Sequence, residues 1–404
     1  MPHSAKVDLE KPVFSAPTSI TNPLFPRVGL TQTVQLGIEA GDKLRFEVTL
    51  LPDTKVIDWG GQAIETRVTH FMAYSNGRIL EVALDFYAQA DDGSVWYFGE
   101  DVFNYEDGVV VDNEGTWLAG KDGPPGMIMP ADPKVGDVYR PENIPGVVFE
   151  EVTVQAVSQT VGGPRGPVSG AIFVQEHLMD GTSEDKVFAP GYGEFRAQVV
   201  SLDEMYGVAF AVPIDALPGT VPGEIAILSS GAAEIMSSSA TEDWIAISAT
   251  LRTMTDAWQQ YQAAGVPERL DVQMSAALDA FSASVDARDP QGARQAAIGV
   301  ARASLDFELS YRPIADVDLD RLALWVNQLH LDLTADDAAL VLGDVAVLEA
   351  IWDRVDHAVS TADAVDAALA ALREAVDAEG MALVSDALGA FRTALQEVTV
   401  ATGG

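Results

Sequence analysis

The sequence contains no cysteine, which excludes disulfides, thiolate metal sites and cysteine nucleophiles. Only five histidines are present, so few imidazoles remain for a metal centre or a catalytic triad. Lysine and arginine are also scarce, with 24 of them against 61 aspartates and glutamates. The net charge of −37 would repel nucleic-acid phosphates and anionic membranes. We therefore expect no nucleic-acid partner and an acidic, well-solvated surface.

Long apolar runs are missing as well. No stretch of 18 uncharged apolar residues occurs, so we expect no membrane span. The first residues, MPHSAKVDLEKP, lack the apolar core of a secretory signal, so any export signal would lie outside this sequence. A chain of 404 residues is too long for one ordinary core, and two domains are expected.

The first half of the chain carries the alternating pattern of half-buried β-strands. Residues 1–26 hold five prolines and are expected to form an extended arm. From there to residue 222 we expect an antiparallel β domain, a meander with a barrel-like closure. Leu44, Phe46 and Val48 share one face of such a strand. Asp-Gly turns follow one another at short spacing, which favours antiparallel strands over alternating βαβ units.

The second half is rich in alanine and aspartate and is expected to be helical. Residues 223–239 are rich in glycine and serine and are interpreted as a linker. Beyond it, residues 240–404 show apolar residues at three- and four-residue steps, as at Leu251, Met254 and Trp258. Short connections imply antiparallel neighbours, so we expect an up-and-down bundle of six or seven helices. The fold class is therefore α+β with two domains.

One hairpin brings together the best candidates for metal ligands. Asn76-Gly77 is the strongest short hairpin signal in the chain, and it predicts that the flanking strands pair from Ser75 and Arg78 outward. Counting back, His70 would lie opposite Ala83, with Glu81 and Asp85 as diagonal neighbours on the same face. One imidazole between two carboxylates suits a divalent ion, so His70, Glu81 and Asp85 form the predicted metal site.

Acidic residues expected in loops offer an alternative site for calcium, although no EF-hand spacing is present. They are Asp91, Asp92, Glu100, Asp101, Glu106 and Asp107. The sequence carries no motif for an organic cofactor.

A series of short segments resembles a known family. The segments are DFYAQ (85–89), GSVWYFGED (93–101), GTWLAG (115–120), PGMIMPA (125–131) and PKVGDVYR (133–140). In this order they resemble exported bacterial β-rich proteins, most of them uncharacterised, over about residues 20–200. The resemblance implies an extracellular, cell-surface or periplasmic location. The helical half resembles no family known to us.

That family is in turn similar to the copper-binding surface proteins of methanotrophs. Those proteins hold copper(I) with two histidines and an oxidised tryptophan, and they also bind calcium. His70 lies on the strand where the resemblance places a histidine. Asp132 stands where a second histidine would be matched, and Val68 is not a tryptophan, so the copper ligands are not all present.

Three functions remain open from the sequence. The first is an acidic surface or exported protein that binds copper or calcium without turnover. The second is a hydrolase that uses carboxylates of the β domain or of the domain junction. The third is an assembly module that binds a protein partner or itself through the helical domain.

Overall fold

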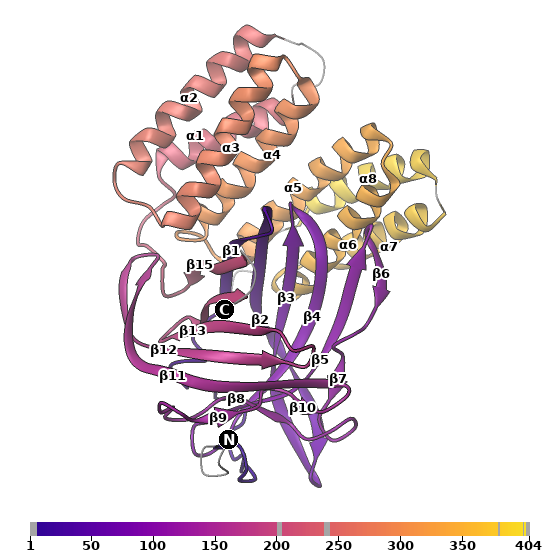
Figure 1. The fold of residues 1–404 in the computed structure, drawn as a ribbon. Helices are drawn as coiled ribbons and strands as arrows, with labels where there is room; N and C mark the ends of the chain where they lie inside the picture. The colour runs from indigo at the N-terminus through magenta and orange to yellow at the C-terminus, as the bar shows by residue number, and fades with distance from the viewer. Residues whose placement is uncertain (1–5, 200–203, 238–242, 379, 399, 401–404) are drawn as a thin grey trace. The chain divides into compact units, whose positions relative to one another are not determined.

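The structure is a computed structural model that describes residues 6–199, 204–237, 243–378, 380–398 and 400 (Figure 1). An antiparallel sheet of 15 strands comes first and eight α-helices follow within the described residues, which confirms the predicted α+β class with two domains. The chain divides into a β unit, residues 1–105 and 110–215, and a helical unit, residues 106–109 and 216–404.

The long strands of the first half of the β unit are β1 (Gln32–Glu39), β2 (Asp42–Trp59), β3 (Gln62–Ser75), β4 (Arg78–Gln89) and β5 (Val95–Glu106). Short strands follow: β6 (Val109–Asp112), β7 (Trp117–Leu118), β8 (Gly126–Met129), β9 (Val138–Tyr139) and β10 (Asn143–Ile144). The second half holds β11 (Val148–Gly163), β12 (Gly166–Leu178), β13 (Ser183–Ala189), β14 (Gly193–Val199) and β15 (Glu204–Val212).

The sheet is a continuous antiparallel path in which β15 returns to pair with β1. The order runs from β10 through β15 to β1 and on to β6, while β7 and β8 pair with β5 and β9 pairs with β11. Figure 1 shows β11–β13 running across the direction of β2–β5. Both parts of the sheet contribute to one core, in which Phe86 and Phe98 lie with Val152, Ile172 and Phe188. The sheet therefore encloses its own interior.

The N-terminal segment reaches this interior without regular secondary structure. Ile20, Leu24 and Phe25 are buried in the core, and Arg140 binds Asp8 with two hydrogen bonds of 2.7 and 3.0 Å. Residues 6–26 are thus laid against the β domain, as the proline-rich sequence predicted, and residues 1–5 lie outside the described part.

The helical unit contains α1 (Gly223–Ser237), α2 (Trp244–Gln262), α3 (Glu268–Ala287), α4 (Pro290–Glu308), α5 (Ile314–Ala335), α6 (Ala338–Val355), α7 (Asp363–Asp377) and α8 (Met381–Gln396). Helices α1–α4 contact one another, and so do α5–α8. Asp337 caps α6 by accepting from the backbone nitrogen of Leu340 at 3.2 Å. None of the described helices is long and apolar enough to cross a membrane.

The predicted linker at 223–239 is wrong over Gly223–Ser237, which form α1. Ile225, Leu228, Ala232 and Ile235 are buried at helical spacing, so the segment has an apolar face that its glycine and serine content conceals. Gly231 lies where α1 meets α2, and a Cβ there would lie 2.6 Å from the sulfur of Met254, so the Met254 side chain would have to move. Residues 238 and 239 lie outside the described part.

Candidate functional site

The β3–β4 hairpin has the predicted turn but a different register. Ser75 pairs with Arg78 across Asn76-Gly77, whose φ angles of 49° and 77° suit this turn. The register then shifts by one residue, because Tyr74 pairs with Ile79 whereas Ala73 pairs with Glu81. The extra residue on β4 is a β-bulge, which the hairpin rule cannot foresee.

This shift separates His70 from the two acids, so the predicted arrangement is wrong. His70 lies opposite Leu84 rather than Ala83, and its neighbour Thr69 lies opposite Asp85. Thr69 donates a hydrogen bond of 3.0 Å to Asp85, which puts these two side chains on one face of the sheet. Because side chains alternate along a strand, His70 points to the other face. Glu81 and Asp85 do stay together on one face.

A second bulge brings another carboxyl group to this face. Asp85 pairs with Glu100 of β5, and Tyr87 pairs with Tyr97, so one residue of β4 between the pairs faces two residues of β5. Gly99 occupies this bulge with φ of 123°, and a Cβ there would lie 2.2 Å from the carbonyl oxygen of Trp117. Only glycine fits this backbone. The bulge therefore puts Tyr97 and Glu100, three residues apart, on the same face.

These residues border a cavity of about 250 Å³ inside the curled sheet. Its acidic lining consists of Glu81, Asp85, Glu100 and Glu194, with one arginine, Arg27. The other lining residues are Phe25, Thr33, Gln35, Phe46, Val48, Phe71, Ala83, Tyr87, Ile128, Phe188, Tyr192 and Tyr206. We call this space, with these lining residues, the carboxyl cavity.

The acids at the base of the carboxyl cavity are buried and mutually repelling. Burial raises the pKa of Asp85, although hydrogen bonds from Tyr97 (2.7 Å) and Thr69 (3.0 Å) and the charge of Arg27 oppose this rise. Burial raises the pKa of Glu100 well above its ordinary value, and the charges of Asp85 and Glu142 add to the effect. The repulsion between these two acids therefore favours the neutral form of each.

Glu142 extends this acidic group behind the cavity. Its carboxyl accepts a hydrogen bond of 3.0 Å from the indole of Trp117, which is almost fully buried. Burial raises the pKa of Glu142, and a hydrogen bond shared with Glu100 acts against that rise.

Glu81 differs from the other acids in having nothing to offset its charge. Burial, followed by the charge of Asp85, raises the pKa of Glu81 to about 7. Within the described residues, no hydrogen bond or cation contributes to this value. Glu194, by contrast, accepts from Tyr206 at 3.0 Å and lies 3.6 Å from Lys186. Glu81 is therefore the acid of this cavity that lacks a protein partner.

Aromatic rings and one hydroxyl complete the lining near Glu81. Phe46 stacks on Phe71 with ring centres 5.7 Å apart, and Tyr206 meets Phe46 edge-on at 4.6 Å. Thr33 follows in the same row, since it pairs with Val48, which pairs with Phe71. The hydroxyl oxygen of Thr33 is buried and has no hydrogen-bond partner in the described part of the protein. A buried polar atom of this kind indicates a place for a ligand or water.

The predicted calcium ligands are mostly engaged in other roles. Glu100, Asp101 and Glu106 lie in β5 rather than in loops, and Glu100 faces the carboxyl cavity. Asp91 accepts from Ser15 of the N-terminal segment, whereas Asp92 accepts from Ser94 within its own turn. No group of three or more histidine or acidic side chains in the described ranges is placed to hold a metal ion.

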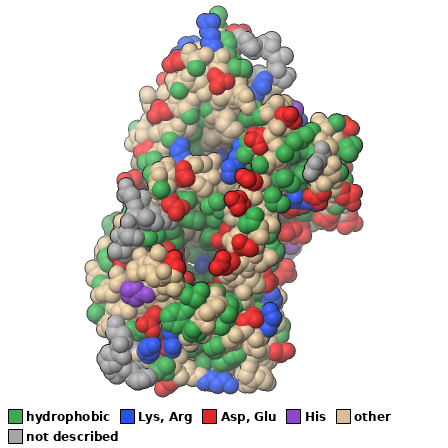
Figure 2. Space-filling view, turned by 45° about the vertical axis from the view of Figure 1, so that its right-hand side comes forward, with side chains coloured by type: hydrophobic (Ala, Val, Ile, Leu, Met, Phe, Trp, Pro, Cys, Tyr) green, Lys and Arg blue, Asp and Glu red, His purple; other side chains and the backbone are tan. Residues whose placement is uncertain are grey.

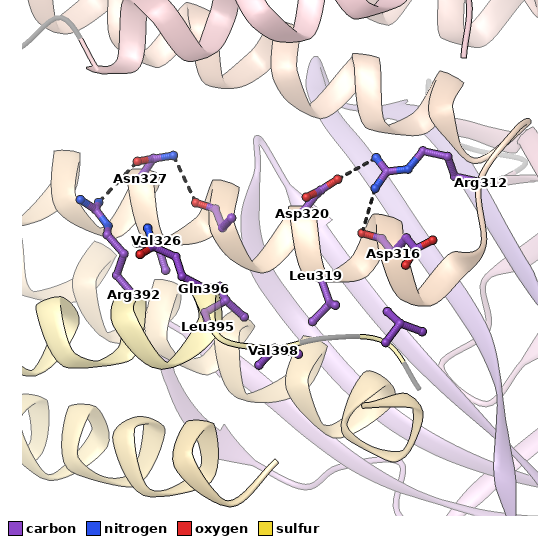
Figure 3. A pocket seen from close by; sticks show the side chains of 12 residues that line it. Arg312, Asp316, Leu319, Asp320, Val326, Asn327, Arg392, Leu395, Gln396 and Val398 are labelled. Carbon is purple, nitrogen blue, oxygen red and sulfur yellow. Dashed lines mark hydrogen bonds and ion pairs between the residues drawn. The ribbon is translucent and has the colours of Figure 1, made fainter. Parts of the chain in front are cut away.

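A second cavity, of about 590 Å³, lies between α5 and α8 in the helical unit (Figure 3). One of its charged groups is already paired, because Arg312 forms an ion pair of 2.7 Å with Asp320 and a second with Glu308. Arg392 reaches Asn327 at 3.5 Å. Residues 399 and 401–404, next to its C-terminal lining, lie outside the described part. The carboxyl cavity is the better candidate, because its lining includes the buried Thr33 hydroxyl, which has no partner among the described residues.

The surface matches the composition. Figure 2 shows aspartate and glutamate side chains spread over the visible face, with fewer lysines and arginines among them. Such a surface raises the local concentration of cations through its long-range field.

Comparisons with protein-family models, curated proteins and solved structures found no match to this chain.

Proposed function

We propose that the β domain binds a small ligand in the carboxyl cavity and releases it unchanged. The observation that carries this proposal is the unmatched lining: Thr33 has a buried hydroxyl without a partner, and Glu81 has a carboxyl without a counter-ion. Both side chains line a half-open cavity of about 250 Å³, large enough for a small organic molecule. A protein with no ligand to bind gains nothing from burying such groups.

A thermal-shift screen of small metabolites tests this proposal. A ligand at 100 times its Kd stabilises the folded protein by about 2.7 kcal/mol, which raises Tm by several degrees. Ala83→Phe fills the carboxyl cavity and should abolish the shift, whereas Ala63→Phe, at an exposed position on β3, should not. A ligand whose shift survives Ala83→Phe binds elsewhere and would contradict the proposal.

Metal binding is a separate proposal, supported by the acidic composition and the family resemblance. Glu81 and Asp85 share a face, but His70 does not join them, so any site would use carboxylates and favour calcium over copper. This proposal is an alternative to an organic ligand at Glu81, and it predicts close to one calcium per chain by mass spectrometry of the protein as isolated, before any chelator. Loss of that metal in Glu81→Gln with Asp85→Asn would support the site, and an unchanged metal content would contradict it. Export to the cell surface stays a prediction.

A hydrolase is the second candidate function, and the pKa of Glu81 favours it. A carboxyl group with a pKa of about 7 can donate and accept protons at neutral pH, and Asp85 lies two positions along the same strand face. Activity on esters, glycosides or phosphates should then fall at least about 100-fold in Glu81→Gln. Activity that persists in this variant would exclude Glu81 as the acid.

Assembly through the helical domain also stays a prediction, which light scattering of the full chain can test.

A further inference from the structure

We infer that the ligand of the carboxyl cavity is a small organic ammonium ion, held between the Phe46–Phe71 ring pair and the Glu81 carboxylate. This inference rests on the proposed function and gives the ligand its chemical class. Some lining groups of the cavity already have a hydrogen-bond or charge partner within the protein, and those without one indicate the ligand.

The rings around Glu81 form one continuous patch because of the strand register. Ala73 pairs with both Phe46 and Glu81, so the ring and the carboxylate lie on either side of a small residue. Phe71 pairs with Ala83, the next position on the same face of β4. Two alanines thus leave open the space between the rings and the acid. Aromatic faces attract cations, and best when the site excludes water.

Charge selects a cation over an anion or a neutral molecule. The charged groups that face Glu81 are Asp85 on its own strand, Glu100 of β5, Glu194 of β14 and Arg27 of the N-terminal segment. Glu100 interacts with Glu142, and Glu194 is paired with Lys186. Arg27 lies over the rings of Phe25 (4.4 Å) and Tyr87 (5.7 Å), and its charge offsets that of Asp85, although its Nε has no hydrogen-bond partner in the described part of the protein. The uncompensated charge in the cavity is therefore negative and centred on Glu81.

Size and hydrogen bonding argue for an organic ion rather than a bare metal. A metal ion is bound by several carboxylate oxygens that point to one place. The lining near Glu81 instead consists of aromatic rings, a hydroxyl and one free carboxylate, which suits a ligand with an apolar surface. The hydroxyl of Thr33 can accept from an N–H or O–H group of the ligand. An ammonium ion that carries a hydroxyl would satisfy Thr33 and Glu81 together.

Choline and 3,3-dimethylbutan-1-ol form a matched pair of probes, since they share a shape and differ in charge. We would measure their binding to the full chain by calorimetry at pH 8, where Glu81 is ionised. Sodium phosphate buffer avoids competing amines, and 0.15 M salt screens the general attraction of the acidic surface. Choline should bind at one site per chain, at least about ten-fold more tightly than the neutral probe.

Three variants separate charge from ring contacts. Glu81→Gln should weaken choline binding at least about ten-fold and leave the neutral probe unchanged. Phe71→Leu should weaken choline binding several-fold, because the ring face is lost. Glu65→Gln, at an exposed position on β3, is the control and should change neither. Thermal melting checks that each variant folds.

The neutral probe binding as tightly as choline, or choline binding unaffected by Glu81→Gln, would overturn the inference. It would also be overturned if neither probe bound while the metabolite screen found a neutral or anionic ligand sensitive to Ala83→Phe. In that case the proposed binding function would stand. If neither probe bound and the metabolite screen found no ligand, both the inference and the proposed binding function would be overturned.

Discussion

Asp85 and Glu100 lie directly opposite each other on β4 and β5, with both carboxyl groups on the face that lines the carboxyl cavity. Like charges in this position destabilise a sheet, and their side chains approach closely. Burial raises the pKa of both acids, and the charge of Asp85 adds to the rise at Glu100, so both groups are shifted toward the neutral form. Sites where burial and like charges coincide are more often functional than structural.

Removing the charge of Asp85 should lower the pKa of Glu100. In Asp85→Asn the burial of Glu100 remains, but the repulsion from its neighbour is lost, so its pKa should fall while staying above its ordinary value. Carbon-13 NMR of the glutamate carboxyl groups over pH 4–9 measures this. Asp101→Asn is a suitable control, because Asp101 pairs with Lys55 at 2.8 Å. A Glu100 pKa that is equal in all three proteins would show that the two acids do not interact.

Glu81→Gln should stabilise the protein at neutral pH. Between pH 4.5 and about 7 the unfolded chain ionises Glu81 while the folded protein keeps it protonated, so the wild type loses stability as pH rises through this window. Above pH 7 the loss is complete. The variant should therefore gain about 1 to 3 kcal/mol over the wild type by pH 8, and almost nothing at pH 4. Urea unfolding at both pH values decides this, and a difference independent of pH would refute the shifted pKa.

Gly99→Ala should destabilise the β domain by about 2 to 3 kcal/mol, because it adds a close contact to a strained φ. The new Cβ would meet the backbone carbonyl of Trp117 at 2.2 Å, which no side-chain rotation relieves. Gly93→Ala is the matched control: its φ of 93° is also positive, but its nearest neighbour is 3.5 Å away, so only the conformational strain remains. Urea unfolding should show the larger loss for Gly99→Ala. Equal losses would mean that the bulge adapts.

Arg354→Met should cost about 3 to 5 kcal/mol, because it breaks a buried ion network in the helical unit. Arg354 is fully buried and donates to Asp318 at 2.7 and 2.9 Å. Asp318 also accepts from Arg321 at 2.8 Å, and Arg321 reaches Asp306 at 3.0 Å.

The matched control for this network is Arg373→Met, which removes a partly exposed pair with Glu349 and should cost less than about 1 kcal/mol. Urea unfolding measures both. Similar values for the two arginines would show that burial adds nothing to this network.

Local patterns along the chain predicted most elements and missed those that depend on contacts. Alternation along β2 and the Asn76-Gly77 turn were sufficient for the β meander, because strand period and turn chemistry are local. Helix α1 was missed because glycine and serine have weak helix propensity, and it is packing against α2, with Gly231 against Met254, that favours the helix.

The sequence by itself determined the acidic charge, the absence of cysteine chemistry, the two-domain α+β fold and two of the acids that share a face, Glu81 and Asp85. The tertiary structure alone decided the rest of the site. Because of the bulge in β4, His70 lies on the opposite face of the sheet from Glu81 and Asp85. Because of the bulge at Gly99, Glu100 lies on the same face as Asp85. A shift of one residue exchanges the two faces of a strand, and only the pairing of strands reveals such a shift.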